Sequence, residues 1–349
     1  MTRKESIYGL TRDELSARLS AIGKPRYRAD QIFSWLYEKL VTDPAAWTSL
    51  PTSLRETVSS LFSCELPAIG QELASGDGTI KYRLALDDGE AIECVVMPDG
   101  ESDGISLCVS SQVGCSLRCA FCKTGTMGLR RNLEAAEIVA QVVMMLSRIK
   151  ERPSRVNIVF MGMGEPLLNM EAMLTALEIL NDAHGLAVPM RRIVVSTAGI
   201  PEGIRRLFSA ENLPRAPRLA VSLNAPDQEL REKLMPVAAR YRLPELMATL
   251  QSLPEEAFKR ERLTMEYVLL GGVNDSPAQA RKLAGLLRGL RVKVNLIPYN
   301  ACEGLPFAIP GEAAIDAFLG EMVNAGINCT VRRSRGGELS AACGQLVVD

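Results

Sequence analysis

Short β-branched runs alternate with amphipathic segments over most of this chain, and this alternation restricts the possible folds more than any other feature. Six runs between residues 104 and 300 predict strands: ISLCVS, RVNIVFMG, RRIVVSTAG, PRLAVSLNA, LTMEYVLLGG and VKVNLIPYN. Amphipathic segments such as residues 133–146 separate them. Strands that alternate with helices are typical of a parallel sheet built from βα units. The pattern therefore predicts an α/β protein with a partial (β/α)6 barrel.

Three regions follow from the changes of pattern along the chain. Residues 1–65 predict a small helical domain, and residues 66–103 predict a short antiparallel β extension. The extension shows period-two runs that are separated by GDG and DDG, which are hairpin turn signals. Residues 104–349 predict the barrel core, with a last strand in NCTVRRSRG and a C-terminal segment that contains a cysteine.

The helical region begins with a capping box, Thr11 to Glu14, and a second helix is predicted over residues 24–39. The leading end of this second helix carries Lys24, Arg26 and Arg28. These cations are either a solvated helix end or a surface that contacts RNA phosphates.

Composition limits the partners and the compartment. The net charge of −1 argues against coating of nucleic acid over the whole surface, although it permits a local basic face. The first residues, MTRKESIYGLTRDEL, contain no apolar core, and no apolar run approaches the ~18 residues of a membrane span. We therefore expect a cytoplasmic protein without membrane contact. The single histidine, His184, excludes a histidine triad and a multi-histidine metal site.

Nine cysteines in a cytoplasmic chain point to metal binding or catalysis before structural disulfides. Three of them, Cys115, Cys119 and Cys122, lie in GCSLRCAFCKTG directly after the first predicted barrel strand. Zinc sites usually use two cysteine pairs, and no second pair follows here. Three thiolates would instead leave one iron of a [4Fe–4S] cluster open for a substrate or cofactor. Incidental thiols and a zinc loop are the alternatives.

The chain resembles the RlmN/Cfr family of radical S-adenosylmethionine (SAM) RNA methyltransferases. The resemblance is carried by LCVSSQVGCSLRCAFCKTGTMGLRRNL, VFMGMGEPLLN and AACGQL, and it extends from about residue 80 to the C-terminus. It implies a [4Fe–4S] cluster on the three cysteines and two SAM molecules per turnover. It also implies methylation of C2 of adenine 2503 in 23S rRNA, with C2 of adenine 37 in tRNA as a further candidate target. The expected partners are these RNAs and an electron donor such as flavodoxin, and the protein is expected to be a monomer.

The resemblance further implies a route in which a cysteine carries the methyl group. C2 of adenine is electron-poor and cannot attack the methyl group of SAM, so one SAM methylates Cys343 instead. A radical from a second SAM then takes a hydrogen atom from that methyl group, and the resulting carbon adds to adenine. Cys108 is implied as the thiol that releases the product through a transient disulfide. Taken alone, Cys343 could equally be a buried core cysteine.

Glu93 in EAIECVVMP aligns with the proton acceptor of the family. Its neighbours in the sequence are apolar, and a desolvated carboxylate suits a general base. The alternative is a solubilising charge at a strand edge.

Contacts to SAM are implied at the ends of the predicted strands. The residues are Gly164, Glu165, Ser196, Ser222, Leu223, Asn224 and Asn300. Asn224 stands where the family usually has histidine. An amide still donates and accepts hydrogen bonds, but it cannot titrate near neutral pH.

Three groups of arginines lie beside motifs or predicted strand ends, and they could form one basic rim for RNA or be ordinary solvated charges. These groups are Arg130 and Arg131, Arg191 and Arg192, and Arg332, Arg333 and Arg335. Two other functions remain open from the sequence: methylation of C8 of adenine by the resistance branch of the same family, and a zinc-stabilised RNA-binding module without catalysis.

Overall fold

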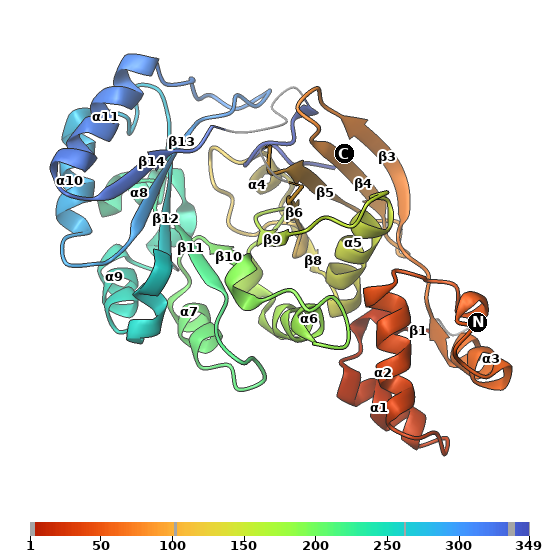
Figure 1. Ribbon diagram of the computed structural model, residues 1–349. Coiled ribbons are helices and arrows are strands. Elements are labelled where there is room, and N and C mark those ends of the chain that lie inside the picture. The colour runs from red at the N-terminus through yellow and green to blue at the C-terminus, as the bar shows by residue number, and fades with distance from the viewer. Residues whose placement is uncertain (1–3, 101–102, 262, 334–338, 349) are drawn as a thin grey trace.

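A ten-stranded sheet organises the molecule, and its strand order is β14-β13-β12-β11-β10-β9-β6-β5-β4-β3 (Figure 1). The structure, a computed structural model, describes residues 4–100, 103–261, 263–333 and 339–348. Within this sheet, β6, β9, β10, β11, β12, β13 and β14 pair with one another in parallel, whereas β3, β4, β5 and β6 pair antiparallel. The prediction of an α/β fold with a parallel barrel sheet is confirmed.

Each of the six predicted barrel runs forms a strand. The strands are β6 (Ile105–Cys108), β9 (Val156–Phe160), β10 (Ile193–Thr197), β11 (Arg218–Ser222), β12 (Leu263–Leu269) and β13 (Lys293–Pro298). A seventh parallel strand, β14 (Asn328–Val331), covers the start of the predicted run NCTVRRSRG. The sheet curves, because Val159 of β9 and Ile297 of β13 line one cavity although β10, β11 and β12 lie between them in the sheet order.

Helices follow these strands and lie on the outer side of the curved sheet (Figure 1). The longer ones are α5 (Ala135–Ser147), α6 (Met170–Asn181), α7 (Pro201–Phe208), α8 (Gln228–Leu234), α9 (Leu243–Gln251), α10 (Pro277–Leu286) and α11 (Glu312–Asn324). Short helices are η4 (Pro166–Leu168), η5 (Met190–Arg192), η6 (Pro236–Ala239) and η7 (Glu255–Glu261). Neighbouring helices pack in pairs, α5 on α6 and α10 on α11. These contacts bury the apolar stripe of each helix, which stabilises the barrel.

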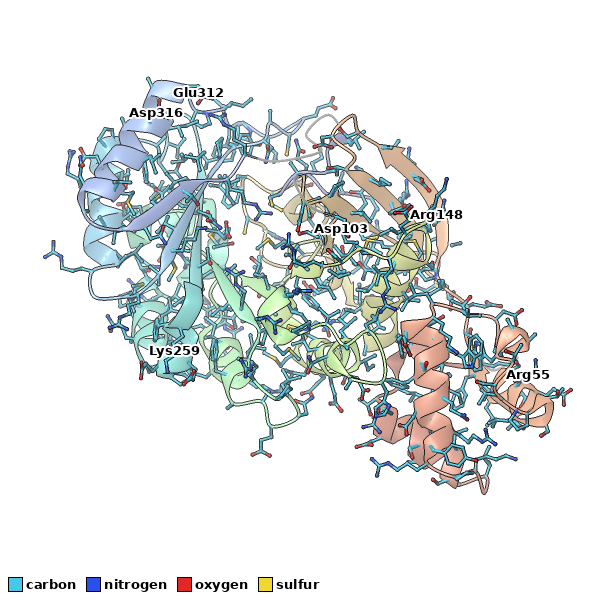
Figure 2. All side chains as sticks on the ribbon, in the orientation of Figure 1. Arg55, Asp103, Arg148, Lys259, Glu312 and Asp316 are labelled. Carbon is cyan, nitrogen blue, oxygen red and sulfur yellow. The ribbon has the colours of Figure 1, made fainter. Side chains whose placement is uncertain are left out.

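The predicted antiparallel strands are β3 (Ala68–Ala74), β4 (Ile80–Ala85) and β5 (Ala91–Pro98). They continue the barrel sheet, because β5 pairs with the first barrel strand β6. Arg148, at the end of α5, adds a second connection (Figure 2). Its guanidinium lies 2.8 Å from the Glu72 carboxylate of β3 and 5.9 Å from the ring centroid of Tyr82 in β4. The extension is therefore held to the barrel by both the sheet and a helix.

The N-terminal region consists of short elements. They are β1 (Glu5–Ser6), η1 (Ile7–Gly9), α1 (Arg12–Ser20), α2 (Tyr27–Phe33), the π-helical turn η2 (Ser34–Glu38), η3 (Pro44–Ala46), α3 (Thr52–Leu61) and β2 (Phe62–Ser63). The predicted capping box forms: Thr11 N donates to Glu14 Oε2 at 2.8 Å, and Glu14 N donates to Thr11 Oγ1 at 3.2 Å. Arg12 joins this region to the barrel through Asp182, at 3.0 Å.

The cysteine loop leaves the barrel after β6 and is bounded by β7 (Gln112–Gly114), α4 (Lys123–Met127) and β8 (Leu129–Asn132). Gly114 is required there: its φ is +75°, and a Cβ atom would lie 1.8 Å from Gly128 O. In the part of the chain that the structure describes, no helix is long and apolar enough to cross a membrane.

Candidate active site

Two cavities adjoin at Cys343, which lines both of them. One lies at the carboxyl ends of the barrel strands, and the other lies inside the curved sheet. The first, which we call the cluster cavity, is lined by Cys115, Cys119 and Cys122 together with residues at the strand ends. The second cavity is lined by side chains of β5, β6, β9 and β13 and by Arg332. This arrangement places one cysteine between two differently built chambers.

The three cysteines of the loop lie in the wall of the cluster cavity, and burial raises the pKa of each thiol. The pKa of Cys115 rises to about 12, and those of Cys119 and Cys122 also lie above the usual range of a cysteine. Phe121 is buried in a small apolar cluster with Met235, as its position before the last cysteine suggests. Cys115 is buried, and Cys119 and Cys122 are half-buried in the cavity wall.

Six of the seven residues predicted to contact SAM line the cluster cavity. They are Gly164, Glu165, Ser196, Ser222, Asn224 and Asn300. Leu223 does not: its side chain is fully buried in the core, and its carbonyl oxygen accepts a hydrogen bond from Arg231 Nε at 3.2 Å. Gly164 has a φ of +100°, and a Cβ atom there would lie 2.5 Å from Gln112 Cβ. Only glycine fits that position.

Glu165 shapes the cavity wall through its carboxylate. The carboxylate accepts hydrogen bonds from the backbone N–H of Leu167 at 3.1 Å and of Ala198 at 2.7 Å. Burial raises the pKa of Glu165 to about 7, although these backbone donors oppose the rise. The side chain therefore joins the end of β9 to the end of β10, and both of these ends border the cavity.

The local backbone geometry explains why asparagine is suitable at position 224. Its φ is +57°, a left-handed conformation that asparagine tolerates better than most residues. Its Oδ1 accepts a hydrogen bond from Val268 N at 2.9 Å, and its Nδ2 lies 3.3 Å from Met235 Sδ. The amide thus connects the end of β11 to β12.

Cys108 and Cys343 both line the second cavity, although 235 residues separate them. Burial raises the pKa of the Cys108 thiol to about 12; a charge on Cys343 raises it further, and Arg332 lowers it. The predicted attack by Cys108 requires partial ionisation, which this burial opposes. The structure therefore brings the two thiols to one cavity but keeps Cys108 protonated near neutral pH.

Glu93 is buried in β5 and lines neither cavity. Its neighbours in the sequence are apolar, but its carboxylate is paired, because Lys81 Nζ lies 2.9 Å from Glu93 Oε1. The other carboxylate oxygen accepts a hydrogen bond from Val347 N at 2.9 Å. Glu93 therefore joins the β extension to the C-terminal segment that carries Cys343.

Comparisons with known proteins agree with this geometry. The Radical SAM superfamily model matches residues 109–284, and the model of the ribosomal RNA large subunit methyltransferase N-terminal domain matches residues 6–63. A crystal structure of a radical SAM methyltransferase from Sphaerobacter thermophilus aligns with a TM-score of 0.92 at 45% identity, covering 98% of this chain and 99% of that one.

Curated relatives carry the comparison further. A dual-specificity RNA methyltransferase RlmN from Nitratidesulfovibrio vulgaris is 43% identical, over 97% of this chain and 93% of the relative. One of the same name from Lawsonia intracellularis is 44% identical, over 94% of this chain and 92% of the relative. This chain belongs to the RlmN family of radical SAM methyltransferases. The family and enzyme class predicted from the sequence are confirmed.

Membership of the radical SAM superfamily implies a [4Fe–4S] cluster and SAM, and the cluster cavity of this RlmN-family chain fits both. Among the described residues, no three His, Cys, Asp or Glu side chains are close enough together to hold a single metal ion. A cubane needs no such convergence, since each thiolate binds its own iron. The three thiols face one cavity, and Gly164 and the polar strand ends border the same space.

The arginines do not form the single basic rim considered from the sequence. Arg130 and Arg131 pair with Glu90 and Asp88 of the β extension. Arg191 and Arg192 lie in η5, directly before β10 and therefore at the opposite end of the strands from the cluster cavity.

The members of the third group of arginines have different surroundings. Arg332 is half-buried in the wall of the second cavity, where its Nη1 lies 3.7 Å from Met161 Sδ. Negative charge on Cys343 raises the pKa of Arg332. Arg333 also lines this cavity, but its side chain is exposed and lies 2.6 Å from the carboxylate of Glu312, which Figure 2 labels at the start of α11. Arg335 lies outside the described residues.

Sequence reasoning missed three functional candidates: Lys81, Glu266 and the location of Arg332. Lys81 lies on the strand next to Glu93, and the period-two pattern of both strands could have placed them on one face. Glu266 lines the cluster cavity and is 5% exposed; burial raises its pKa. Its Oε1 accepts a hydrogen bond from Asn295 Nδ2 at 3.0 Å. No local sequence signal marks Glu266, because its run LTMEYVLL is typical of a buried strand.

Proposed function

We propose that this chain methylates C2 of adenine 2503 in 23S rRNA and C2 of adenine 37 in tRNA, with Cys343 as the methyl carrier. The observation that carries the proposal is that Cys343 lines the cluster cavity and the second cavity at once. A methyl carrier needs access to both the methyl donor and the base that receives the methyl group. The names of the relatives support RNA as the substrate.

The cluster cavity would serve the methyl donor. A bound [4Fe–4S] cluster with SAM supplies one-electron chemistry, and Cys115, Cys119 and Cys122 would hold three of its irons. Gly164 gives the cavity wall a backbone conformation that a larger residue could not adopt, because its Cβ atom would collide with Gln112. Glu165 fixes the backbone that borders this space, and Asn300 reaches toward the segment of Cys343, with its Nδ2 3.5 Å from Cys343 O.

The second cavity would serve the adenine and the release of the product. Arg332 stabilises negative charge on Cys108, because its guanidinium lowers the pKa of that thiol. When the Cys108 thiolate attacks, a sulfur–sulfur bond forms as the sulfur–carbon bond of Cys343 breaks. The electron pair of the broken bond stays with the carbon, which takes up a proton and becomes the methyl group of the product. An external reductant then reopens the disulfide. We include Glu93 as the group that takes the C2 proton, which requires that its hydrogen bond to Val347 opens when RNA binds.

The identity of the product tests this proposal. The cluster is assembled without oxygen, and methyl-deuterated SAM, a reductant such as reduced flavodoxin and unmodified 23S rRNA are added. The digested nucleosides are then analysed by mass spectrometry. Labelled 2-methyladenosine is the expected product, and tRNA substrates are tested in the same way. Labelled 8-methyladenosine would assign the chain to the C8 activity instead.

A preparation made without oxygen separates the enzyme from an RNA-binding module. We expect a brown protein with broad visible absorption, because three buried thiols at a cavity suit an iron–sulfur cluster. A colourless, zinc-loaded protein that binds RNA but gives no labelled adenosine would contradict the proposal.

A further inference from the structure

The C-terminal residues 340–348, which we call the acceptor segment, are fastened directly to the cysteine loop. The backbone N–H of Lys123 donates to Gly344 O at 2.7 Å. The hydroxyl of Thr124 donates to Leu346 O at 2.6 Å. Both donors lie within two residues after Cys122. The last cluster cysteine is therefore adjacent in the sequence to the residues that hold the acceptor segment.

Thr124 is the side chain that makes this connection. It is 3% exposed, and its hydrogen bond joins residues 222 positions apart in the sequence. Removal of a buried donor leaves its carbonyl partner unsatisfied, which costs more than the net value of the bond. Thr126 offers an internal comparison: its hydroxyl is exposed and bonds to Lys123 O at 2.7 Å, within the same short helix α4.

The opposite side of the acceptor segment is held by groups outside the loop. Val347 N donates to Glu93 Oε2 at 2.9 Å, and Gln345 Nε2 donates to Ala301 O at 2.9 Å. Cys343 therefore lies on a segment that is fixed by the loop on one side and by the β extension and the end of β13 on the other. Loss of the loop contact would leave Cys343 attached only to the second set.

We propose that Thr124 is a positioning residue that couples the cysteine loop to the acceptor segment. The conformation of the loop then determines the position of Cys343 between the two cavities. This inference deepens the proposed function and rests on Cys343 as the methyl acceptor. Ligation of iron by Cys122 would fix the backbone that carries Lys123 and Thr124. Their two hydrogen bonds would then fix Gly344 and Leu346, which flank the acceptor cysteine.

Hydrogen exchange and thiol alkylation on Thr124→Val test the coupling without RNA or turnover. Valine keeps the branched shape and removes the hydroxyl donor. At equal cluster content, measured by visible absorption, we expect about tenfold faster amide exchange in the peptide that contains residues 344–348. Alkylation of Cys343 by iodoacetamide, followed by peptide mass spectrometry, should also accelerate. Thr124→Ser should restore both rates, and Thr126→Val should match the unsubstituted protein.

Wild-type exchange and alkylation rates in Thr124→Val would overturn the proposal, as would a failure of Thr124→Ser to restore them. A second variant, in the acceptor segment, keeps the test usable if Thr124→Val assembles its cluster poorly. Gly344→Ala leaves the loop intact but strains the segment, because Gly344 has a φ of +84°. We expect faster exchange there too, and unchanged exchange would also contradict the coupling. The exchange and alkylation rates do not depend on methylation. A failure of this coupling can therefore be told apart from a failure of the proposed function.

Discussion

The cluster cavity and the second cavity share Cys343, yet the chain builds them in different ways. The cluster cavity is formed where strands end, from a loop and from residues that directly follow β9, β10, β11 and β13. The second cavity is formed inside the sheet, from side chains such as Met97, Ser106 and Val159 that belong to neighbouring strands. Short-range motifs specify the first cavity, whereas strand pairing and curvature specify the second.

The difference also appears in the charges of the two cavities. The cluster cavity collects thiols and the carboxyl groups of Glu165 and Glu266, and burial raises the pKa of both carboxyl groups. The second cavity is lined by the guanidinium groups of Arg332 and Arg333 and by Asp99. A cavity of thiols and buried acids suits a metal cluster, since metal binding displaces thiol protons. A cavity with a fixed cation instead stabilises a thiolate. Substitutions that affect one cavity and spare the other therefore test this division.

The largest expected effect belongs to the cysteine that the cavities share. Cys343→Ala should abolish methylation of RNA, a loss of at least about 10³-fold, because no other thiol would carry the methyl group between the cavities. Visible absorption of the cluster should be unchanged. Cys329→Ala is the matched control, because Cys329 is a half-buried cysteine of β14 that lines neither cavity. Labelled methyladenosine from Cys343→Ala would show that the shared position is not functional.

A smaller effect, on stability, should come from the ion pair behind the second cavity. Lys81→Met leaves the buried Glu93 without its cation, and we expect the free energy of unfolding to fall by about 3–5 kcal/mol. The double substitution Lys81→Met with Glu93→Gln should recover part of this loss. Urea unfolding at neutral pH measures both.

Arg130→Met is the control for the ion pair, since Arg130 pairs with Glu90 at a more exposed site. Such a surface pair contributes about 1 kcal/mol or less. Equal losses in Lys81→Met and Arg130→Met would contradict the view that burial makes the Lys81–Glu93 pair the costlier one to break.

The same contrast explains how far the sequence could predict the molecule. The alternation of strands and helices predicted the parallel sheet, because each run is short and bounded by turn signals. The cysteine loop, GMGEP and the strand ends predicted the cluster cavity, because carboxyl ends of parallel strands meet at one edge. Leu223 differs from its neighbours: it follows Ser222 at a strand end, but its side chain is buried in the core and does not line the cavity.

The second cavity could not be predicted in the same way. Its arginine-rich run leaves Arg332 as part of a basic rim for RNA or as a solvated charge, but the curvature of the sheet turns it inward beside Cys108 and Cys343. Lys81 was missed because its partnership with Glu93 depends on the register between β4 and β5. Local periodicity can place Lys81 and Glu93 on one face, but it contains no information about strand register or the curvature of the sheet.

The smallest expected effect sharpens the role of Arg332. Burial raises the pKa of Cys108 to about 12, so the thiolate fraction should increase about tenfold per pH unit between pH 7 and pH 10. Alkylation of Cys108 by a small thiol reagent, measured by peptide mass spectrometry, should follow this rise. Arg332→Met removes a charge that lowers the pKa of Cys108, so the rate should fall a further ~2- to 5-fold at each pH. Arg281→Met should leave it unchanged, because Arg281 is exposed, pairs with Glu321 and lines neither cavity. A rate that reaches a plateau near pH 8 would mean that Cys108 is not the dry thiol of the second cavity, and equal effects of the two arginines would place Arg332 at the surface.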